Sequence, residues 1–391
     1  MLTLKELDLL LSKPLREAVR DNLDKDPAKI ALDKNIPHAK LVATQVKYLQ
    51  KAKKKIPSFY KAQCIISPKA YEQCSSEAAA SHRHFGGEFC LDLGSGLGVD
   101  TYYFSKRFDR VISIEQDPVL TEIARANFDM LGRHNISVVK MDVIEALEEH
   151  PTLSADMVFM DPDRRGADGK KKVTLEDCSP DVGKLLSLLK KMAPKILLKL
   201  SPMFDIDEAF RIFGPHIVVD AVSVDGECKE VLVEIDNRIE SPVIKASGVG
   251  NYEVEYPYGK EDKVQTAPFT SWSQFRYMII PDVSLAKARI AKKYFTENGA
   301  YIESDNAYAF SDTIPKERVG RVFEIESVEK YSPKNLRAKL AEMKVKKINI
   351  MKHEFPFSTD KIAKELGVGE GGTRYVAFTT VADKRWAVFL K

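Results

Sequence analysis

The sequence predicts an α/β protein centred on a mainly parallel, seven-stranded sheet, with a helical region before it and an α+β region after it. Between residues 89 and 235, short apolar runs alternate with amphipathic segments of helix length, which requires parallel strands with helices on both faces. The turn Asp225-Gly226 joins the last two runs and is too short for a crossover helix, so these runs predict an antiparallel hairpin. The expected strands are 89–93, 110–114, 136–140, 157–160, 196–200, 217–223 and 230–235.

The length and composition exclude several classes of protein. A chain of 391 residues with 44% hydrophobic and 30% charged residues is long enough for two or three domains and is too apolar to be disordered. No apolar run approaches the roughly 20 residues that span a bilayer, and Glu6 and Asp8 interrupt the N-terminal leucines, which argues against export. Five cysteines without a CxxC pair argue against a disulfide framework or a zinc ribbon and fit a reducing cytoplasm. We expect no metal, because the pair His82 and His84 has no third ligand nearby in the sequence.

The N-terminal region is predicted to be helical and basic. Apolar residues recur at helical spacing from Leu4 to about Tyr60. Residues 1–85 contain 16 Lys or Arg and 9 Asp or Glu, an excess of +7, and a basic tract at 51–55 precedes Phe59 and Tyr60. This pattern is typical either of a surface for a polyanion or of a solvated helical face.

A glycine-rich segment after the first expected strand points to a nucleotide-like cofactor. The strand runs into the loop 94–98, which reads GxGxG, and Glu115 follows at the end of the next strand, 21 residues after Gly94. Small residues allow close approach of a ligand to the backbone, and a carboxylate at the end of the second strand can accept hydrogen bonds from ribose hydroxyls. The fingerprint of nicotinamide enzymes is GxGxxG, with the third glycine one place later.

With this loop, its carboxylates and the terminal hairpin, the segment 74–235 resembles the class I S-adenosyl-L-methionine (SAM) methyltransferases, which have a Rossmann-like sheet. The resemblance implies SAM as the cofactor. Asp92 and the loop would hold the methionine part, Glu115 the ribose and Asp142 the adenine amino group, while Gln73 or Ser75 would lie near the methionine end. The alternative for Ser75 or Ser76 is a helix N-cap. The implied cofactor-binding residues are Gln73, Ser75, Asp92, Gly94, Ser95, Gly96, Gly98, Asp100, Glu115, Gln116, Asp142, Val143 and Asp161.

The segment after the fourth expected strand predicts the acceptor site. It reads Asp161-Pro162-Asp163-Arg164 and resembles the motif of methyltransferases that act on exocyclic amines, although only its first two positions match. We expect these four residues to be catalytic, with Asp161 orienting the acceptor and taking its proton, and with Arg164 stacking on a base or holding a phosphate. Methylation of pyrimidine C5 would need a cysteine nucleophile, and the strand end at 199–202 has none, so the sequence favours N-methylation.

The whole chain resembles one bacterial family of methyltransferases. The resemblance rests on the helical N-terminal region with its lysine tract and on the segments QCSSE, GxGxGVD, DPDRRG, KLSPMFD and GECKE. It implies four parts, which are a helical domain at 1–70, a methyltransferase domain at 71–240, a ferredoxin-like region at 241–320 and a THUMP-like domain at 321–391. It also implies a structured RNA substrate, either tRNA or rRNA.

Basic residues supply partial independent support for an RNA substrate, because phosphate contacts give affinity while a pocket selects the base. The alternatives are a methyltransferase that acts on a protein or small molecule, and a non-catalytic RNA-binding protein with a methyltransferase fold. The oligomeric state is not predicted. The candidate RNA-binding residues are Lys53, Lys54, Lys55, Arg164, Arg165, Lys171, Lys346, Lys347 and Arg374.

Overall fold

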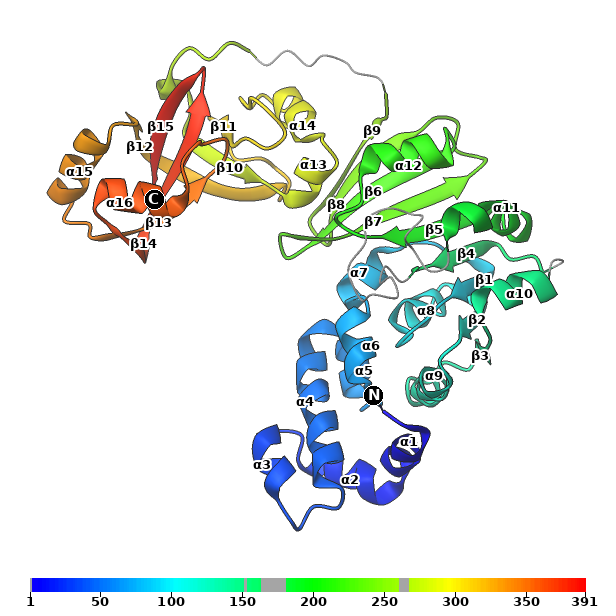
Figure 1. Ribbon diagram of the computed structural model, residues 1–391. Helices are drawn as coiled ribbons and strands as arrows, with labels where there is room; N and C mark the ends of the chain where they lie inside the picture. Colours follow the sequence, from blue (N-terminus) through cyan, green and yellow to red (C-terminus); the bar gives the residue numbers. More distant parts are fainter. Residues whose placement is uncertain (1, 151–152, 163–180, 260–266) are drawn as a thin grey trace. The chain divides into compact units, whose positions relative to one another are not determined.

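A computed structural model describes residues 2–150, 153–162, 181–259 and 267–391 (Figure 1). The chain forms two compact units, the first made of Met1–Val219 with Lys229–Pro242 and the second of Asp220–Cys228 with Val243–Lys391. Within the described ranges, no helix is both long enough and apolar enough to cross a membrane.

Seven helices precede the sheet of the first unit, and five of them lie in the region from Leu4 to about Tyr60 that the apolar spacing predicts to be helical. Thr3 begins the first of them with a capping box, because its hydroxyl accepts from the backbone of Glu6 and the Glu6 carboxylate accepts in return. A proline occupies the first turn of four others, where its missing N–H costs nothing. The helices are α1 (Leu4–Leu11), α2 (Lys13–Asp21), α3 (Pro27–Leu32), α4 (Ala39–Lys55), α5 (Pro57–Lys61), α6 (Pro68–Gln73) and α7 (Glu77–His82).

All seven expected strands are present, and their bounds differ from the expected ones by at most three residues. They are β1 (Gly87–Leu93), β2 (Phe108–Glu115), β3 (Ile136–Lys140), β4 (Met157–Met160), β5 (Lys195–Leu200), β6 (Ile217–Val224) and β7 (Glu227–Asp236). Their order is β3-β2-β1-β4-β5-β7-β6; the first five pair in parallel and β7 runs antiparallel to β5. The α/β class and the terminal hairpin are therefore confirmed. The helices between these strands are α8 (Val99–Phe104), α9 (Pro118–Met130), α10 (Val143–Glu149), α11 (Val182–Met192) and α12 (Ile206–Phe213).

The strand order determines where a ligand can bind. The chain builds β1, β2 and β3 toward one edge of the sheet and then returns to place β4 on the other side of β1. In open α/β sheets, the loops at the carboxyl ends of such neighbouring strands diverge and leave a crevice. The glycine-rich loop follows β1 and Asp161 follows β4, so both lie at this switch point.

A two-residue segment joins the N-terminal helices to the sheet domain. Asn127 of α9 accepts from the backbone N–H of Ile65 (2.8 Å) and donates to its carbonyl (2.9 Å), while Gln45 of α4 makes the same pair of bonds to Ile66 (3.0 Å each). Both amide side chains are buried. The surrounding hydrophobic cluster includes Phe59 of α5 and Phe128 of α9, so the helical region and α9 share one core.

The second unit is an α+β structure, as expected. A hairpin of β8 (Val243–Gly248) and β9 (Tyr252–Pro257) precedes the 3-10 helix η2 (Trp272–Gln274) and a six-stranded sheet of order β11-β10-β12-β15-β14-β13. Its strands are β10 (Tyr277–Pro281), β11 (Ala309–Ser311), β12 (Gly320–Lys330), β13 (Lys347–Lys352), β14 (Gly369–Val381) and β15 (Lys384–Leu390), and its helices are α13 (Val283–Lys287), α14 (Ala291–Glu297), α15 (Pro333–Glu342) and α16 (Thr359–Leu366).

One helix of this unit differs from its expected form. The apolar spacing predicts a single helix at 285–298, but the structure has α13 and α14 with a break between them. Arg289 has φ of 58°, a left-handed conformation that ends the first helix. The division into four domains remains a prediction, and the six-stranded sheet continues across its boundary at 320.

We predict that Asn127→Leu lowers the free energy of unfolding of the first unit by about 3 kcal/mol, because it leaves the buried N–H and C=O of Ile65 without partners. Urea unfolding followed by circular dichroism measures this loss. Asn35→Leu is the control, because Asn35 is exposed and its removal should change stability by less than about 0.5 kcal/mol. Equal effects of the two substitutions would contradict the prediction.

Candidate functional site

The glycine-rich loop after β1 leaves open space at two positions and is tightly packed at a third. Gly94, Gly96 and Gly98 have φ of 89°, 57° and 82°, which favours glycine at each. A Cβ atom at Gly94 or Gly96 would meet no other atom within 4 Å, whereas at Gly98 it would lie 2.5 Å from the ring of Phe128. The loop can therefore accept a ligand against its first two glycines, while the close packing of Gly98 on Phe128 holds the loop against α9.

The carboxylate of Glu115, at the end of β2, accepts from two backbone N–H groups, one of which belongs to this loop. The backbone N–H of Gly96 donates to Oε2 of Glu115 (2.9 Å), and the N–H of Asp117 donates to Oε1 (2.9 Å). Burial raises the pKa of Glu115, and the backbone donors oppose that rise. The carboxylate lies beside the loop, where the sequence predicts a ribose contact. Gln116 is exposed next to it.

Asp142 follows β3 and caps α10. Its carboxylate accepts from the N–H groups of Ile144 (2.8 Å) and Glu145 (3.4 Å), and the residue is exposed. Val143 begins the helix and is half-buried. Asp142 and Val143 therefore belong to a preformed turn, and the Asp142 carboxylate is accessible to a ligand.

Buried polar atoms beside the loop fit a polar cofactor. Asp92 is completely buried in β1, and the hydroxyl of Thr101 donates to its Oδ2 (2.5 Å). Its other oxygen and the hydroxyl of Ser95 are also buried, and neither has a hydrogen-bond partner within the described ranges. Burial raises the pKa of Asp92 to about 7. Unpaired buried polar groups are costly, so a ligand that hydrogen-bonds to them gains affinity.

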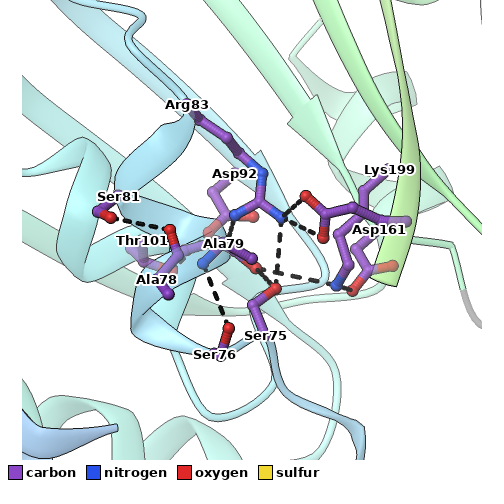
Figure 2. Close-up of polar contacts among 12 residues, drawn as sticks. Ser75, Ser76, Ala78, Ala79, Ser81, Arg83, Asp92, Thr101, Asp161 and Lys199 are labelled. Atoms are coloured by element: carbon purple, nitrogen blue, oxygen red, sulfur yellow. Dashed lines mark hydrogen bonds and ion pairs between the residues drawn. The ribbon is translucent and has the colours of Figure 1, made fainter. Parts of the chain in front are cut away.

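Next to Asp92 lies a network of buried charges that we call the ion cluster, made of Arg83, Asp100, Asp161, Lys199 and Glu230 (Figure 2). The guanidinium of Arg83 is inaccessible to solvent. Its Nη2 lies 2.7 Å from both carboxylate oxygens of Glu230, and its Nη1 contacts Asp100. These contacts bring together the start of α8, the end of α7 and strand β7.

Lys199 occupies the other half of the ion cluster. Its ammonium contacts Oδ2 of Asp161 and lies 3.9 Å from Oδ2 of Asp100. Burial alone would lower the pKa of Lys199, but the neighbouring carboxylates raise it above its usual value, so Lys199 is a cation here. Asp161 is thus held in place by a buried positive charge.

Ser75 joins the ion cluster, and Ser76 does not. The Ser75 hydroxyl donates to Oδ2 of Asp100 (2.8 Å) and lies 3.4 Å from Nη2 of Arg83. Ser76 instead caps α7 by accepting from the N–H of Ala79 (3.2 Å). Gln73 is exposed at the end of α6. Of the residues in this segment, Ser75 is the one whose contacts connect it to the candidate site.

Sequence reasoning missed Arg83, Lys199 and Glu230. A signal was present for two of them, because Lys199 ends an apolar strand and Glu230 adjoins one, and a charge in such a place needs a partner. Pro162 is buried after β4. The four predicted site residues Asp163, Arg164, Arg165 and Lys171 lie outside the described residues.

The predicted RNA-binding residues in the described ranges differ in their exposure. Lys53 and Lys54 are exposed on α4, and Lys55 is half-buried and donates to the carbonyl of Tyr71 (2.7 Å). In the second unit, Lys346 and Lys347 are exposed at the start of β13, and Arg374 is ion-paired with Glu326. Lys55 and Arg374 therefore have structural contacts that an RNA would have to replace or share.

Two family models match the chain. Residues 87–301 match the model described as "RNA cap guanine-N2 methyltransferase", and residues 320–391 match the model described as "THUMP domain-like". A crystal structure from Porphyromonas gingivalis W83, described as a "putative methyltransferase", is 24% identical with a TM-score of 0.81 over 97% of each chain, which shows a shared fold. A SAM-dependent methyltransferase from Agrobacterium tumefaciens is 14% identical with a TM-score of 0.30, over 41% of this chain and 59% of that one.

We predict that Asp92→Asn stabilises the ligand-free protein, and that this gain grows with pH. In the folded protein the pKa of Asp92 is raised to about 7, whereas an Asp in an unfolded chain has a pKa of about 4. The natural protein therefore loses stability as the pH rises from about 4 to about 7, because only the folded state retains the proton. From pH 5 to pH 8, the difference in unfolding free energy should grow by about 2 kcal/mol.

Urea unfolding at the two pH values measures this difference. Asp129→Asn removes an exposed carboxylate from α9 and serves as the control. A gain for Asp92→Asn that is the same at both pH values would contradict the assignment of the raised pKa to Asp92.

Proposed function

The chain belongs to the family described as RNA cap guanine-N2 methyltransferase, and from this premise we propose that it transfers a methyl group from SAM to an exocyclic amine of a base in structured RNA. The observation that carries the proposal is the position of Asp161. This carboxylate ends β4 at the switch point of the sheet, next to the strand that bears the glycine-rich loop. We infer the N2 amine of guanine as the acceptor atom from the family description.

We propose that the residues to which the resemblance assigns the cofactor hold it in this protein. Asp92 and the loop would bind the methionine part, Glu115 would accept hydrogen bonds from the ribose hydroxyls, and Asp142 would bind the adenine amino group. The cofactor supplies an electrophilic methyl group on a positively charged sulfur. The open space at Gly94 and Gly96 and the unpaired oxygen of Asp92 support this assignment.

Asp161 is suited to orient an amine. Its side chain is 28% exposed, so an acceptor can reach it, and the contact with Lys199 is made through Oδ2. An amine N–H donated to Oδ1 would direct the nitrogen lone pair, and the same carboxylate could accept the proton that the nitrogen loses. Because the nitrogen needs no covalent activation, this site needs no nucleophile.

An RNA substrate is supported by the second unit. A THUMP-like domain occupies residues 320–391 and exposes Lys346 and Lys347. Exposed cations neutralise phosphates and give affinity that falls with salt. We propose tRNA or rRNA in the cytoplasm as the substrate. The rival acceptor, a protein or small molecule, would make these lysines incidental.

We predict that Asp161→Ala reduces methyl transfer to RNA by at least about a hundredfold, because the acceptor loses its orientation and its proton acceptor. The assay measures radiolabelled methyl transferred from SAM to RNA from a strain that lacks the gene, with parent-strain RNA as the blank. Asp129→Ala is the control for loss of an exposed carboxylate. Label that enters neither RNA, with SAM binding intact, would refute the RNA acceptor.

We predict that the double substitution Lys346→Ala and Lys347→Ala weakens RNA binding. The slope of log Kd against the logarithm of the salt concentration should fall by up to about 2, which corresponds to the loss of two phosphate contacts. Filter binding over a range of salt concentrations measures both quantities. SAM affinity should not change, because neither lysine belongs to the cofactor site. The double substitution Lys361→Ala and Lys364→Ala on α16 removes the same charge from the same domain as a control. An identical salt dependence in all three proteins would contradict a role for Lys346 and Lys347.

A further inference from the structure

Lys199 is a buried lysine at the carboxyl end of the sheet, where the cofactor loop follows β1 and the acceptor segment follows β4. It lies on β5, and its side chain is 9% exposed. Strand β5 pairs in parallel with β4, and Met160 is opposite Leu198. The next residues along the two strands are Asp161 and Lys199, so the register brings them side by side. An ammonium is costly to bury unless a carboxylate faces it, and the strand pairing supplies that carboxylate.

The ammonium of Lys199 lies between a carboxylate of the acceptor side and a carboxylate of the cofactor side. It contacts Oδ2 of Asp161, as Figure 2 shows, and its Nζ lies 3.9 Å from Oδ2 of Asp100. Asp161 directly follows β4, and Asp100 comes two residues after the glycine-rich loop. Burial acts to lower the pKa of Lys199, but the charges of Asp161 and Asp100 raise it above its usual value. Lys199 is therefore a cation that connects the two carboxylates.

The two carboxylates differ in how firmly the rest of the chain holds them. Asp100 accepts from the hydroxyl of Ser75 (2.8 Å) through Oδ2 and contacts the guanidinium of Arg83 through Oδ1. Its side chain is 12% exposed, whereas that of Asp161 is 28% exposed. An exposed aspartate can change its rotamer easily, and an ion pair with a buried cation favours one rotamer over the others. Through Lys199, the well-fixed position of Asp100 is passed on to Asp161.

We propose that Lys199 is a positioning residue for methyl transfer, and that it acts by fixing the carboxylate of Asp161 relative to the loop that holds the methyl donor. This inference rests on the proposed function. In the transfer, the acceptor nitrogen forms a bond to the methyl carbon while the bond from that carbon to sulfur breaks and leaves its electron pair on sulfur. The proton of the nitrogen passes to Oδ1 of Asp161. Lys199 contacts the other oxygen of that carboxylate, so it acts through Asp161.

The rate of such a displacement depends on how precisely the acceptor is placed. The reacting atoms must approach to about 3 to 3.5 Å with their orbitals aligned, and a misplacement of about 1 Å can cost about a hundredfold in rate. Loss of Lys199 removes the ion pair that favours one rotamer of Asp161. The acceptor can then bind and still be poorly aligned with the methyl group, so we expect the loss in kcat and not in the affinity for either substrate.

The first test is Lys199→Met in the full chain, assayed by transfer of radiolabelled methyl from SAM to RNA from a strain that lacks the gene. We expect kcat to fall about thirtyfold, while the KM for RNA and the Kd for SAM change less than about threefold. Lys199→Arg keeps a cation and should lower kcat less than about fivefold. Lys199→Gln replaces Lys199→Met in this comparison if the latter does not fold.

Lys195→Met is the matched control for loss of a lysine from the same strand. Lys195 is ion-paired with Glu234 (2.7 Å) and lies at the other end of β5, opposite Met157. This substitution also removes an ion pair from β5, but it leaves Asp161 and Lys199 in place. It should therefore change kcat by less than about twofold.

A second test separates positioning through Asp161 from a general effect on the fold. In the background of Asp161→Ala, Lys199→Met should change kcat less than about threefold, because the carboxylate that Lys199 positions is already absent. Equal losses in the two backgrounds, equal losses for Lys199→Met and Lys195→Met, or a fully active Lys199→Met would overturn the inference and leave the proposed function standing. A natural protein that transfers no methyl group to this RNA would refute the proposed function and this inference with it.

Discussion

The buried guanidinium of Arg83 is the constraint on which the rest of the catalytic unit depends. An unpaired charge in the interior costs several kcal/mol, so the chain must bring carboxylates to it wherever they lie in the sequence. Glu230 is 147 residues away in sequence and Asp100 is 17 residues away. Pairing Arg83 with both fixes β7, the entry to α8 and the end of α7 relative to one another. Removing Arg83 takes the shared cation away from Glu230 and Asp100, at a cost of about 3 to 5 kcal/mol.

The cofactor site combines two kinds of preorganisation on this frame. The backbone of Gly96 is bonded to Glu115 and the ring of Phe128 lies against Gly98, so the loop has its shape before a ligand arrives. The ion cluster supplies fixed charges, and the ammonium of Lys199 contacts Oδ2 of Asp161 and holds that carboxylate in place. Fixed charges of this kind act without reorganisation during the chemical step.

The predictable features were those encoded locally. The strands alternate with helices at regular spacing, and the glycines and Glu115 stand at fixed distances along the chain, so sequence periodicity located the sheet and the loop. The ion cluster could not be predicted this way, because the pairing of Arg83 with Glu230 depends on which strands become neighbours. Sequence periodicity does not predict the break at Arg289. Apolar spacing indicates which face of a helix is buried, but it carries no information about the φ angle of a single residue. The charge of Lys55 predicts an RNA contact. Its hydrogen bond to the Tyr71 carbonyl depends on tertiary packing, which no local sequence pattern reveals.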